Sequence, residues 1–155
     1  MRAVEIPGSV LETIAVHALA AYPDECCGFL VARPDTEDAA APRSIVRALP
    51  ASNTYEGERR RRFLVRAEEL RGAERDLEGT GEVLAGFYHS HPDHPARPSL
   101  FDQEHAWPWY SYLVTAVTSI HVGETRAFEL DPDTAEFAEV PLRRSAGDPD
   151  RMVGG

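Results

Sequence analysis

The stretch from His89 to Asp102, HSHPDHPARPSLFD, constrains this chain more than any other part of it. It follows a short apolar run, residues 82–88, whose β-branched and aromatic members predict a buried strand. His89 and His91 stand at the end of that strand, and residues two apart on a strand point to the same face of a sheet. We therefore expect the two imidazoles to project together, as two ligands of one metal ion must.

The residues after the histidines predict a third ligand. Pro92 ends the strand because a proline has no N–H to give to a sheet. Ser99 then has the character of a helix N-cap, with Asp102 three residues further on in the first turn. Two imidazoles and one carboxylate, with a fourth position left to water, are typical of catalytic zinc, whereas structural zinc is usually enclosed by four Cys or His ligands.

His89 and His91, followed at these intervals by Ser99 and Asp102, resemble the signature of the JAMM (MPN+) metallopeptidases. No spacing in the chain departs from that signature. The resemblance extends over most of the chain, roughly residues 6–130. A lone His-x-His pair would be weak evidence, since such pairs arise by chance, but the full spaced pattern is specific.

Two further segments carry the resemblance. Residues 22–30, YPDECCGFL, are similar to the family's glutamate strand and put Glu25 in the place of its catalytic glutamate. Residues 106–112, AWPWYSY, look typical of the small prokaryotic branch. A glutamate that begins a buried strand is costly unless a charged or hydrogen-bonding group meets it. Without the downstream motif we would place Glu25 in solvent; with the motif, the catalytic interpretation is the better one.

The resemblance implies one Zn²⁺ ion per chain, bound by His89, His91 and Asp102. Zinc in such a site lowers the pKa of a coordinated water to about 7. Glu25 would take the proton as a general base and return it to the leaving amine. The Ser99 hydroxyl would help to hold the oxyanion of the tetrahedral intermediate, although the same hydroxyl is equally well explained as a helix cap.

Other reactive side chains near the motif are weaker candidates. His94 and His105 do not fit the family's ligand positions. Cys26 and Cys27 are adjacent, so they point to opposite faces of a strand, which disfavours a mutual disulfide. No His–Cys pairing is visible, and strand cysteines are usually inert packing residues, so a nucleophilic role is also disfavoured. A group of aromatic side chains after the motif could line a groove but more often forms core: Trp107, Trp109 and Tyr110.

The fold implied by the resemblance is α/β, the cytidine-deaminase-like MPN fold. In it a mixed central β-sheet is flanked by a long N-terminal helix and a second helix, and a short helix follows the metal-binding strand. The residue pattern agrees: Ser9 to Glu12 reads as a capping box, and residues 67–77 predict an amphipathic helix. In the first helix the predicted buried face consists of Leu11, Ile14, Ala15, Ala18 and Leu19.

Further strands are predicted from alternation and from runs of β-branched and aromatic residues. Residues 25–33 are apolar on both faces, which indicates a central strand. The others are 44–50, 63–65, 112–117, 126–130 and, as an antiparallel partner of the last, 135–142. We expect a turn at Gly123-Glu124. We also expect a single domain over residues 1–144 and a flexible tail over residues 145–155.

Composition limits the partners of the chain. Its 155 residues, 43% apolar and 27% charged, are typical of one soluble domain. A formal net charge of −10 argues against nucleic acid, because phosphate backbones are bound by clustered Lys and Arg. There is no apolar run that could span a bilayer and no secretory signal pattern. We therefore expect no membrane partner and a cytoplasmic location.

For function, the resemblance implies hydrolysis of the peptide or isopeptide bond after the C-terminal Gly-Gly of a ubiquitin-like or sulfur-carrier protein. Such an extended, side-chain-free end can add to an exposed strand edge and enter a narrow groove. Two alternatives stay open: a non-catalytic scaffold of the same fold, disfavoured by the complete ligand set, and a metal-dependent hydrolase of small amides. The oligomeric state, monomer or homodimer, also stays open.

Two remaining features have a common explanation and a less common one. Arg59 to Arg62 is the one basic cluster; such runs are usually solvated, and the alternative is a patch for acidic residues of a protein substrate. The chain ends in Gly154-Gly155, like a carrier protein. A flexible tail is the common explanation, and a product mimic that enters a neighbouring molecule's site is the alternative.

Overall fold

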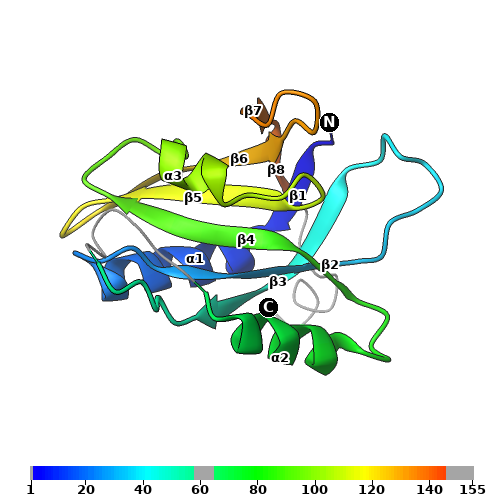
Figure 1. Ribbon diagram of the computed structural model, residues 1–155, viewed down its shortest axis with the longest axis horizontal. Coiled ribbons are helices and arrows are strands. Elements are labelled where there is room, and N and C mark those ends of the chain that lie inside the picture. The colour runs from blue at the N-terminus through cyan, green and yellow to red at the C-terminus, as the bar shows by residue number, and fades with distance from the viewer. Residues whose placement is uncertain (1, 58–64, 146–155) are drawn as a thin grey trace.

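The computed structural model describes residues 2–57 and 65–145, and it confirms the expected α/β fold (Figure 1). Within these residues, eight strands form one mixed sheet in the order β7-β6-β5-β4-β2-β3-β1-β8. The strands are β1 (Val4–Pro7), β2 (Cys27–Ala32), β3 (Arg43–Ala51), β4 (Val83–Pro92), β5 (Ser111–Val117), β6 (Val122–Leu130), β7 (Phe137–Val140) and β8 (Leu142–Ser145). The helices are α1 (Gly8–Ala21), α2 (Ala67–Leu77) and α3 (Leu100–Glu104).

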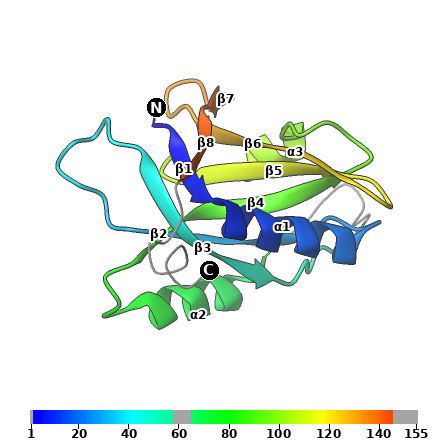
Figure 2. The ribbon, with the colours of Figure 1, turned by 180° about the vertical axis from the view of Figure 1, so that it is seen from behind.

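The helices lie on both faces of the sheet, and each face has its own apolar core. α1 covers one face and α3 lies on the other, as the front and back views show (Figures 1 and 2). Ile14 and Ala18 of α1 are buried in the first core. Ala73 of α2 is buried in the second core together with Phe87 of β4, on the opposite face. The site described below lies on the second face.

The two strands at the centre of the sheet are β2 and β4. All six residues of β2 are buried, which confirms the prediction of a central strand. A Cβ at Gly28 of β2 would lie within 2.2 Å of the Tyr88 ring, so only glycine lets this ring lie across the strand. The Tyr88 hydroxyl then lies 2.7 Å from His17 Nδ1 of α1. Tyr88 therefore fixes β4 to α1, while its neighbours His89 and Phe87 face the other way.

The start of α1 differs from the prediction. The helix begins at Gly8, with Pro7 as its N-cap and no side-chain capping bond, so the expected cap at Ser9 is wrong. Ser9 already lies in the first turn, where its carbonyl accepts a hydrogen bond from the Thr13 hydroxyl at 3.1 Å. Leu19 is 41% exposed, contrary to expectation, because the fully packed positions recur every four residues. These positions are Val10, Ile14 and Ala18.

The second half of the chain follows the predicted order with one error. α2 spans residues 67–77 as predicted, and β5 and β7 lie within or around their predicted ranges. The predicted turn at Gly123-Glu124 is wrong, because both residues lie inside β6. The turn comes earlier, where the Thr118 N–H donates to the His121 carbonyl at 2.7 Å. This allows β6 to start pairing with β5 already at Val122.

The two ends of the described chain meet in the sheet, which the sequence pattern did not predict. β1 pairs in parallel with both β3 and β8. Pro141 separates β7, the antiparallel partner of β6, from β8, because a proline cannot donate to the sheet. β8 ends at Ser145. The division into a domain over residues 1–144 and a flexible tail stays a prediction, because residues 146–155 lie outside the described part.

Several other predictions fall on residues that are not described. These are most of the predicted strand 63–65, the basic cluster of residues 59–62 and the terminal diglycine of residues 154–155. Of the helices in residues 2–57 and 65–145, none has the length and apolar character needed to cross a membrane.

Candidate metal centre

The antiparallel pairing of β2 with β4 brings Glu25 to the two histidines. Cys27 is the register partner of His89 in this antiparallel pair. Two residues before Cys27 is Glu25 and two residues after His89 is His91, so the same register places Glu25 opposite His91. Ser90 extends this pairing beyond β2: its hydroxyl accepts from the Cys26 N–H at 2.8 Å, and its own N–H donates to the Cys26 carbonyl at 3.1 Å. The glutamate, far from the motif in sequence, is thus fixed beside it by strand register.

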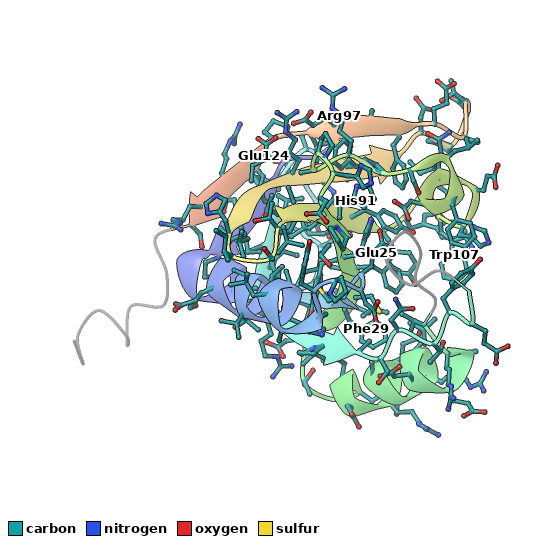
Figure 3. All side chains as sticks on the ribbon, turned by 90° about the vertical axis from the view of Figure 1, so that its left-hand side faces the viewer. Glu25, Phe29, His91, Arg97, Trp107 and Glu124 are labelled. Atoms are coloured by element: carbon teal, nitrogen blue, oxygen red, sulfur yellow. The ribbon has the colours of Figure 1, made fainter. Side chains whose placement is uncertain are left out.

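The two imidazoles share a face, as the sequence predicted. Their ring centroids are 5.2 Å apart. His91 Nε2 lies 3.5 Å from Glu25 Oε1, and Figure 3 shows these two side chains directed toward each other. His91 Nδ1 lies 3.0 Å from the Pro95 carbonyl, which can only accept, so Nδ1 donates there. This hydrogen bond fixes the ring and leaves Nε2 directed to the centre, as in many metal-binding histidines.

Asp102 reaches the imidazole pair from the start of α3. Ser99 and Asp102 form a reciprocal capping box, which confirms Ser99 as the N-cap. The Asp102 N–H donates to Ser99 Oγ at 3.1 Å, and the Ser99 N–H donates to Asp102 Oδ2 at 2.8 Å. The same Oδ2 lies 3.0 Å from His89 Nε2 and 3.4 Å from His91 Nε2. The cap therefore aims the carboxylate at both histidines.

The electrostatics of the two carboxylates are opposite. Burial, followed by the nearby charge of Asp102, raises the pKa of Glu25 to about 9. Burial also acts to raise the pKa of Asp102, but the charge and hydrogen bond of His89 outweigh it and hold that pKa well below its usual range. Two carboxylates with separated pKa values suit two different roles, one that holds a proton and one that stays ionised.

The donors fit a divalent cation. Ligand atoms of Glu25, His89 and His91 all lie within 4.8 Å of one another, and all three residues are buried. Neither carboxylate oxygen of Glu25, which is 1% exposed, has a hydrogen-bond partner in the described chain, and the same holds for Asp102 Oδ1. Buried carboxylate oxygens without partners are costly. An ion with nitrogen and oxygen ligands, such as Zn²⁺, would satisfy them.

A pocket of about 230 Å³ lies beside this centre. His89 and Asp102 form part of its wall, so the pocket reaches the centre itself. The remaining wall is mostly apolar and comes from α2 and the segment before it, from β4, and from the stretch between α3 and β5: Val65, Leu70, Phe87, Phe101, His105, Trp107 and Tyr112. Trp107, seen at the outer side of the molecule in Figure 3, is therefore a pocket residue and not core.

The other candidates from the sequence lie away from the centre or are inert. His94 and His105 are both exposed. The His105 ring packs against Phe101, its Nδ1 donates to the Phe101 carbonyl at 2.8 Å, and the residue borders the pocket. The two cysteines are buried, free and packed in different cores. Burial raises the pKa of Cys26 to about 11 and also raises that of Cys27, so neither is an activated thiol.

Two residues that support the centre were missed by sequence reasoning. The Asn53 side-chain amide donates to the Glu25 carbonyl at 3.1 Å. The Tyr22 hydroxyl donates to Asp93 at 2.7 Å and so connects the segment before Glu25 to the turn after His91. Neither belongs to a spaced motif with the ligands. The polar character of residues 52–57 indicates no more than a loop.

Comparison with known proteins agrees with this geometry. The family described as prokaryotic homologs of the JAB domain matches residues 7–131. A desampylase from Haloferax volcanii is 34% identical over 113 residues, which are 72% of this chain and 76% of that protein.

Solved structures show the same fold. A protein from Desulfitobacterium hafniense has a TM-score of 0.79 at 26% identity, covering 97% of each chain. One from Salinibacter ruber has a TM-score of 0.68 at 33% identity, covering 96% of this chain and 94% of the other. A JAB1/MPN domain protein from Archaeoglobus fulgidus, at 17% identity, shares the fold with a TM-score of 0.56 over 90% of this chain and 99% of its own. With residues 7–131 matched and the expected side chains gathered at the end of β4, the chain belongs to the small prokaryotic branch of the JAMM/MPN family.

Proposed function

We propose that the chain is a zinc-dependent metallopeptidase that hydrolyses the peptide or isopeptide bond after the C-terminal Gly-Gly of a ubiquitin-like or sulfur-carrier protein. The observation that carries the proposal is the position of Glu25: a buried carboxylate, without a hydrogen-bond partner in the described chain, 3.5 Å from His91 Nε2. Membership of the JAMM/MPN family and the desampylase among the relatives support the class of substrate. A cytoplasmic location is part of the same proposal.

His89, His91 and Asp102 would hold the ion, and Glu25 would stay outside the ligand set as the base. Asp102 suits a ligand, because its pKa is held low and its oxygen Oδ2 already lies between the two imidazoles. When bound, a zinc ion supplies Lewis acidity, which polarises a carbonyl and makes a water molecule a better acid.

Glu25 has the properties of a group that accepts and returns a proton. In the metal-free protein, burial and the charge of Asp102 raise the pKa of Glu25, so it holds a proton there. A cation held beside it would favour the ionised carboxylate, which is the form that accepts a proton. It takes a proton from the attacking water at a carboxylate oxygen and delivers it to the leaving nitrogen. Asn53 holds the Glu25 backbone and the register with β4 holds its direction, so the carboxylate need not reorganise between the two transfers.

Ser99 would stabilise the oxyanion. Its Oγ accepts from the Asp102 N–H, which uses a lone pair and leaves the hydroxyl proton free to donate. The hydroxyl therefore can cap α3 and donate to a developing negative charge at the same time.

The test is a comparison of three variants for zinc content and for hydrolysis of a carrier protein fused through its diglycine to a second protein. Glu25→Gln removes the base but no proposed ligand, so we expect normal zinc content and a loss of hydrolysis of at least about 100-fold. His89→Ala should lose both zinc and hydrolysis.

His94→Ala is the matched control, because His94 is an exposed histidine in the loop between β4 and α3. It should keep both properties. Hydrolysis by Glu25→Gln at the normal rate would show that the role given to Glu25 is wrong. Failure of the unchanged protein to cleave any diglycine fusion would overturn the proposed substrate class.

A further inference from the structure

We propose that the pocket beside the metal centre binds the side chain of the residue that directly follows the diglycine, and that it selects a large apolar one such as Phe, Leu or Met. This proposal rests on the proposed function, since it assigns the leaving side of the same bond. The pocket is the one bounded by Leu70, Phe87, Trp107, Tyr112, His89 and Asp102.

The position of the pocket limits which substrate residue can fill it. His89 and Asp102 belong both to the pocket wall and to the candidate metal centre, so the pocket starts where the scissile bond must lie. An extended chain advances by about 3.3–3.6 Å per residue. A side chain two or more residues from the bond is therefore carried away from the pocket mouth, and only the residues on either side of the bond remain.

The acyl side of the bond has nothing to put into the pocket. Both residues before the bond are glycines in the proposed substrates, and glycine has no side chain. A preformed pocket of about 230 Å³ would then stay unfilled unless the amine side fills it. The occupant therefore comes from the leaving group.

The size of the pocket indicates a single side chain. Sites for drug-sized ligands occupy about 300–1,000 Å³, and this pocket is smaller. Its walls come from three stretches of the chain, residues 65–70, 87–89 and 101–112, so it is a depression and not a flat docking surface. An aromatic or long aliphatic side chain matches such a site better than a folded surface does.

The chemistry of the walls favours an apolar occupant. Phe87, Tyr112 and Phe101 present rings to the pocket, and Trp107 borders it while remaining 48% exposed. The one carboxylate in the wall is Asp102, whose Oδ2 is already engaged by Ser99 and His89. An acidic side chain would be placed against Asp102 and would lose its water. An apolar side chain gains by burial against the rings.

The lysine of an isopeptide bond would present its methylene groups at the same position. An apolar occupant could therefore be either this lysine or the first residue of a linear extension. We assign the pocket to the first residue of a linear extension. The aromatic rings of the wall would contact more of a bulky apolar side chain than of a single chain of methylene groups. The experiment therefore includes both kinds of substrate.

The cleavage test uses the zinc-loaded full chain and carrier fusions that differ only in the residue after the diglycine: Phe, Leu, Ala or Asp, and an isopeptide-linked lysine peptide. We expect kcat/KM for Phe to exceed that for Ala by about tenfold or more, from burial of one large apolar side chain, with Asp the slowest. Equal rates for Phe, Ala and Asp, or cleavage of the isopeptide alone, would overturn the pocket assignment and leave the proposed function standing.

Two tryptophans in the same loop provide a matched pair of variants. Trp107 borders the pocket, whereas Trp109 is 74% exposed and is not among the residues that line it. Trp107→Ala should lower the Phe over Ala preference by about fivefold or more while the Ala fusion is still cleaved. Trp109→Ala should leave the preference unchanged. Equal effects of the two variants would contradict the assignment.

A binding measurement decides the matter even if no fusion is cleaved. The chain has two tryptophans, so Trp109→Phe leaves Trp107 as the one reporter of indole fluorescence. We expect a peptide that begins with Phe, the product of cleavage, to shift or quench this emission with saturation, and a peptide that begins with Ala to do so at least about tenfold more weakly. Equal or absent responses would overturn the pocket. Saturable Phe binding without any cleavage would count against the proposed function alone.

Discussion

Glu25 combines two properties that are hard to reconcile in a residue kept for stability alone. Its carboxylate is buried, and within the described chain neither oxygen accepts a hydrogen bond. Burial and the charge of Asp102 raise its pKa to about 9. A protein tolerates such a group where chemistry needs it, and perturbed carboxylates of this kind are concentrated in functional sites.

The raised pKa of Glu25 predicts how the stability of the metal-free protein depends on pH. Between pH 4.5, the ordinary pKa of a glutamate side chain, and about pH 9 the folded state holds a proton that the unfolded state has lost. The free energy of unfolding contributed by Glu25 therefore falls as pH rises through this range. Glu25→Gln, which cannot ionise, should be more stable than the unchanged protein by roughly 1–3 kcal/mol at about pH 8 and by little at about pH 5.

Urea unfolding in the presence of a chelator, at several pH values, measures this difference. In Glu25→Gln the free energy of unfolding should depend less on pH above about pH 5. Parallel stability curves for the two proteins would mean that Glu25 is not proton-linked to folding.

Ser99 can be tested for its two roles separately. Ser99→Ala removes the cap of α3 and should lower the free energy of unfolding by about 1 kcal/mol. If the hydroxyl also donates to the oxyanion, kcat should fall by about 100-fold, far more than the lost cap explains. Ser99→Thr keeps the hydroxyl and should keep most of the stability and most of kcat. A kcat that changes no more than stability does would leave Ser99 as a helix cap only.

The elements place the side chains of the candidate centre by two simple devices, strand register and a helix cap. The register of β2 with β4 puts Glu25 opposite His91, and the capping box of α3 turns Asp102 toward both imidazoles. The spacing of the motif predicts the second device directly, because a cap and its partner lie three residues apart. The β2–β4 register, which places Glu25, could be predicted only from the family resemblance, because no local pattern tells which strands pair.

Local rules also explain where the prediction of elements failed. The cap at Ser9 and the turn at Gly123 were read from residue types that suit those roles, but β1 ends at Pro7 and β6 extends over Gly123. Strand pairing shifts the boundary in both cases: β1 pairs with the distant strands β3 and β8, whereas β6 pairs with its hairpin neighbour β5 from Val122 onward. The parallel contact of β1 with β8 joins the two ends of the described chain, and nothing local marks it.

Asn53 connects the loop after β3 to the segment that carries Glu25. Its amide donates to the Glu25 carbonyl, and its side-chain oxygen accepts from the Tyr55 N–H at 3.1 Å. Asn53→Asp keeps the shape and the acceptor but removes the donor. We expect unchanged zinc content and a kcat reduced by roughly tenfold, because the base is less well held.

Elemental analysis measures the zinc content of Asn53→Asp and of the unchanged protein, and kinetics with one diglycine fusion measure kcat for both. Loss of zinc in Asn53→Asp would contradict a role limited to Glu25, and an unchanged kcat would show that the register with β4 alone holds the base.

Across the whole molecule, the sheet acts as a rigid frame that brings distant segments to one place. α1 supports β4 from one face through Tyr88, and the pocket with its apolar walls opens on the other. Glu25 precedes β2, the histidines lie at the end of β4, and Asp102 lies in the first turn of α3. The motif indicated which residues meet, while the pocket could not be foreseen, because its walls come from segments with no sequence relation to one another.

Glu25, His89, His91 and Asp102 should converge on one divalent ion. Anomalous X-ray scattering at the zinc edge, from crystals grown with zinc, locates that ion. We predict one ion per chain, bound by His89, His91 and Asp102, with Glu25 beside it and not among its ligands. An ion bound at other residues, or a zinc-saturated crystal with none between the two histidines, would contradict the account.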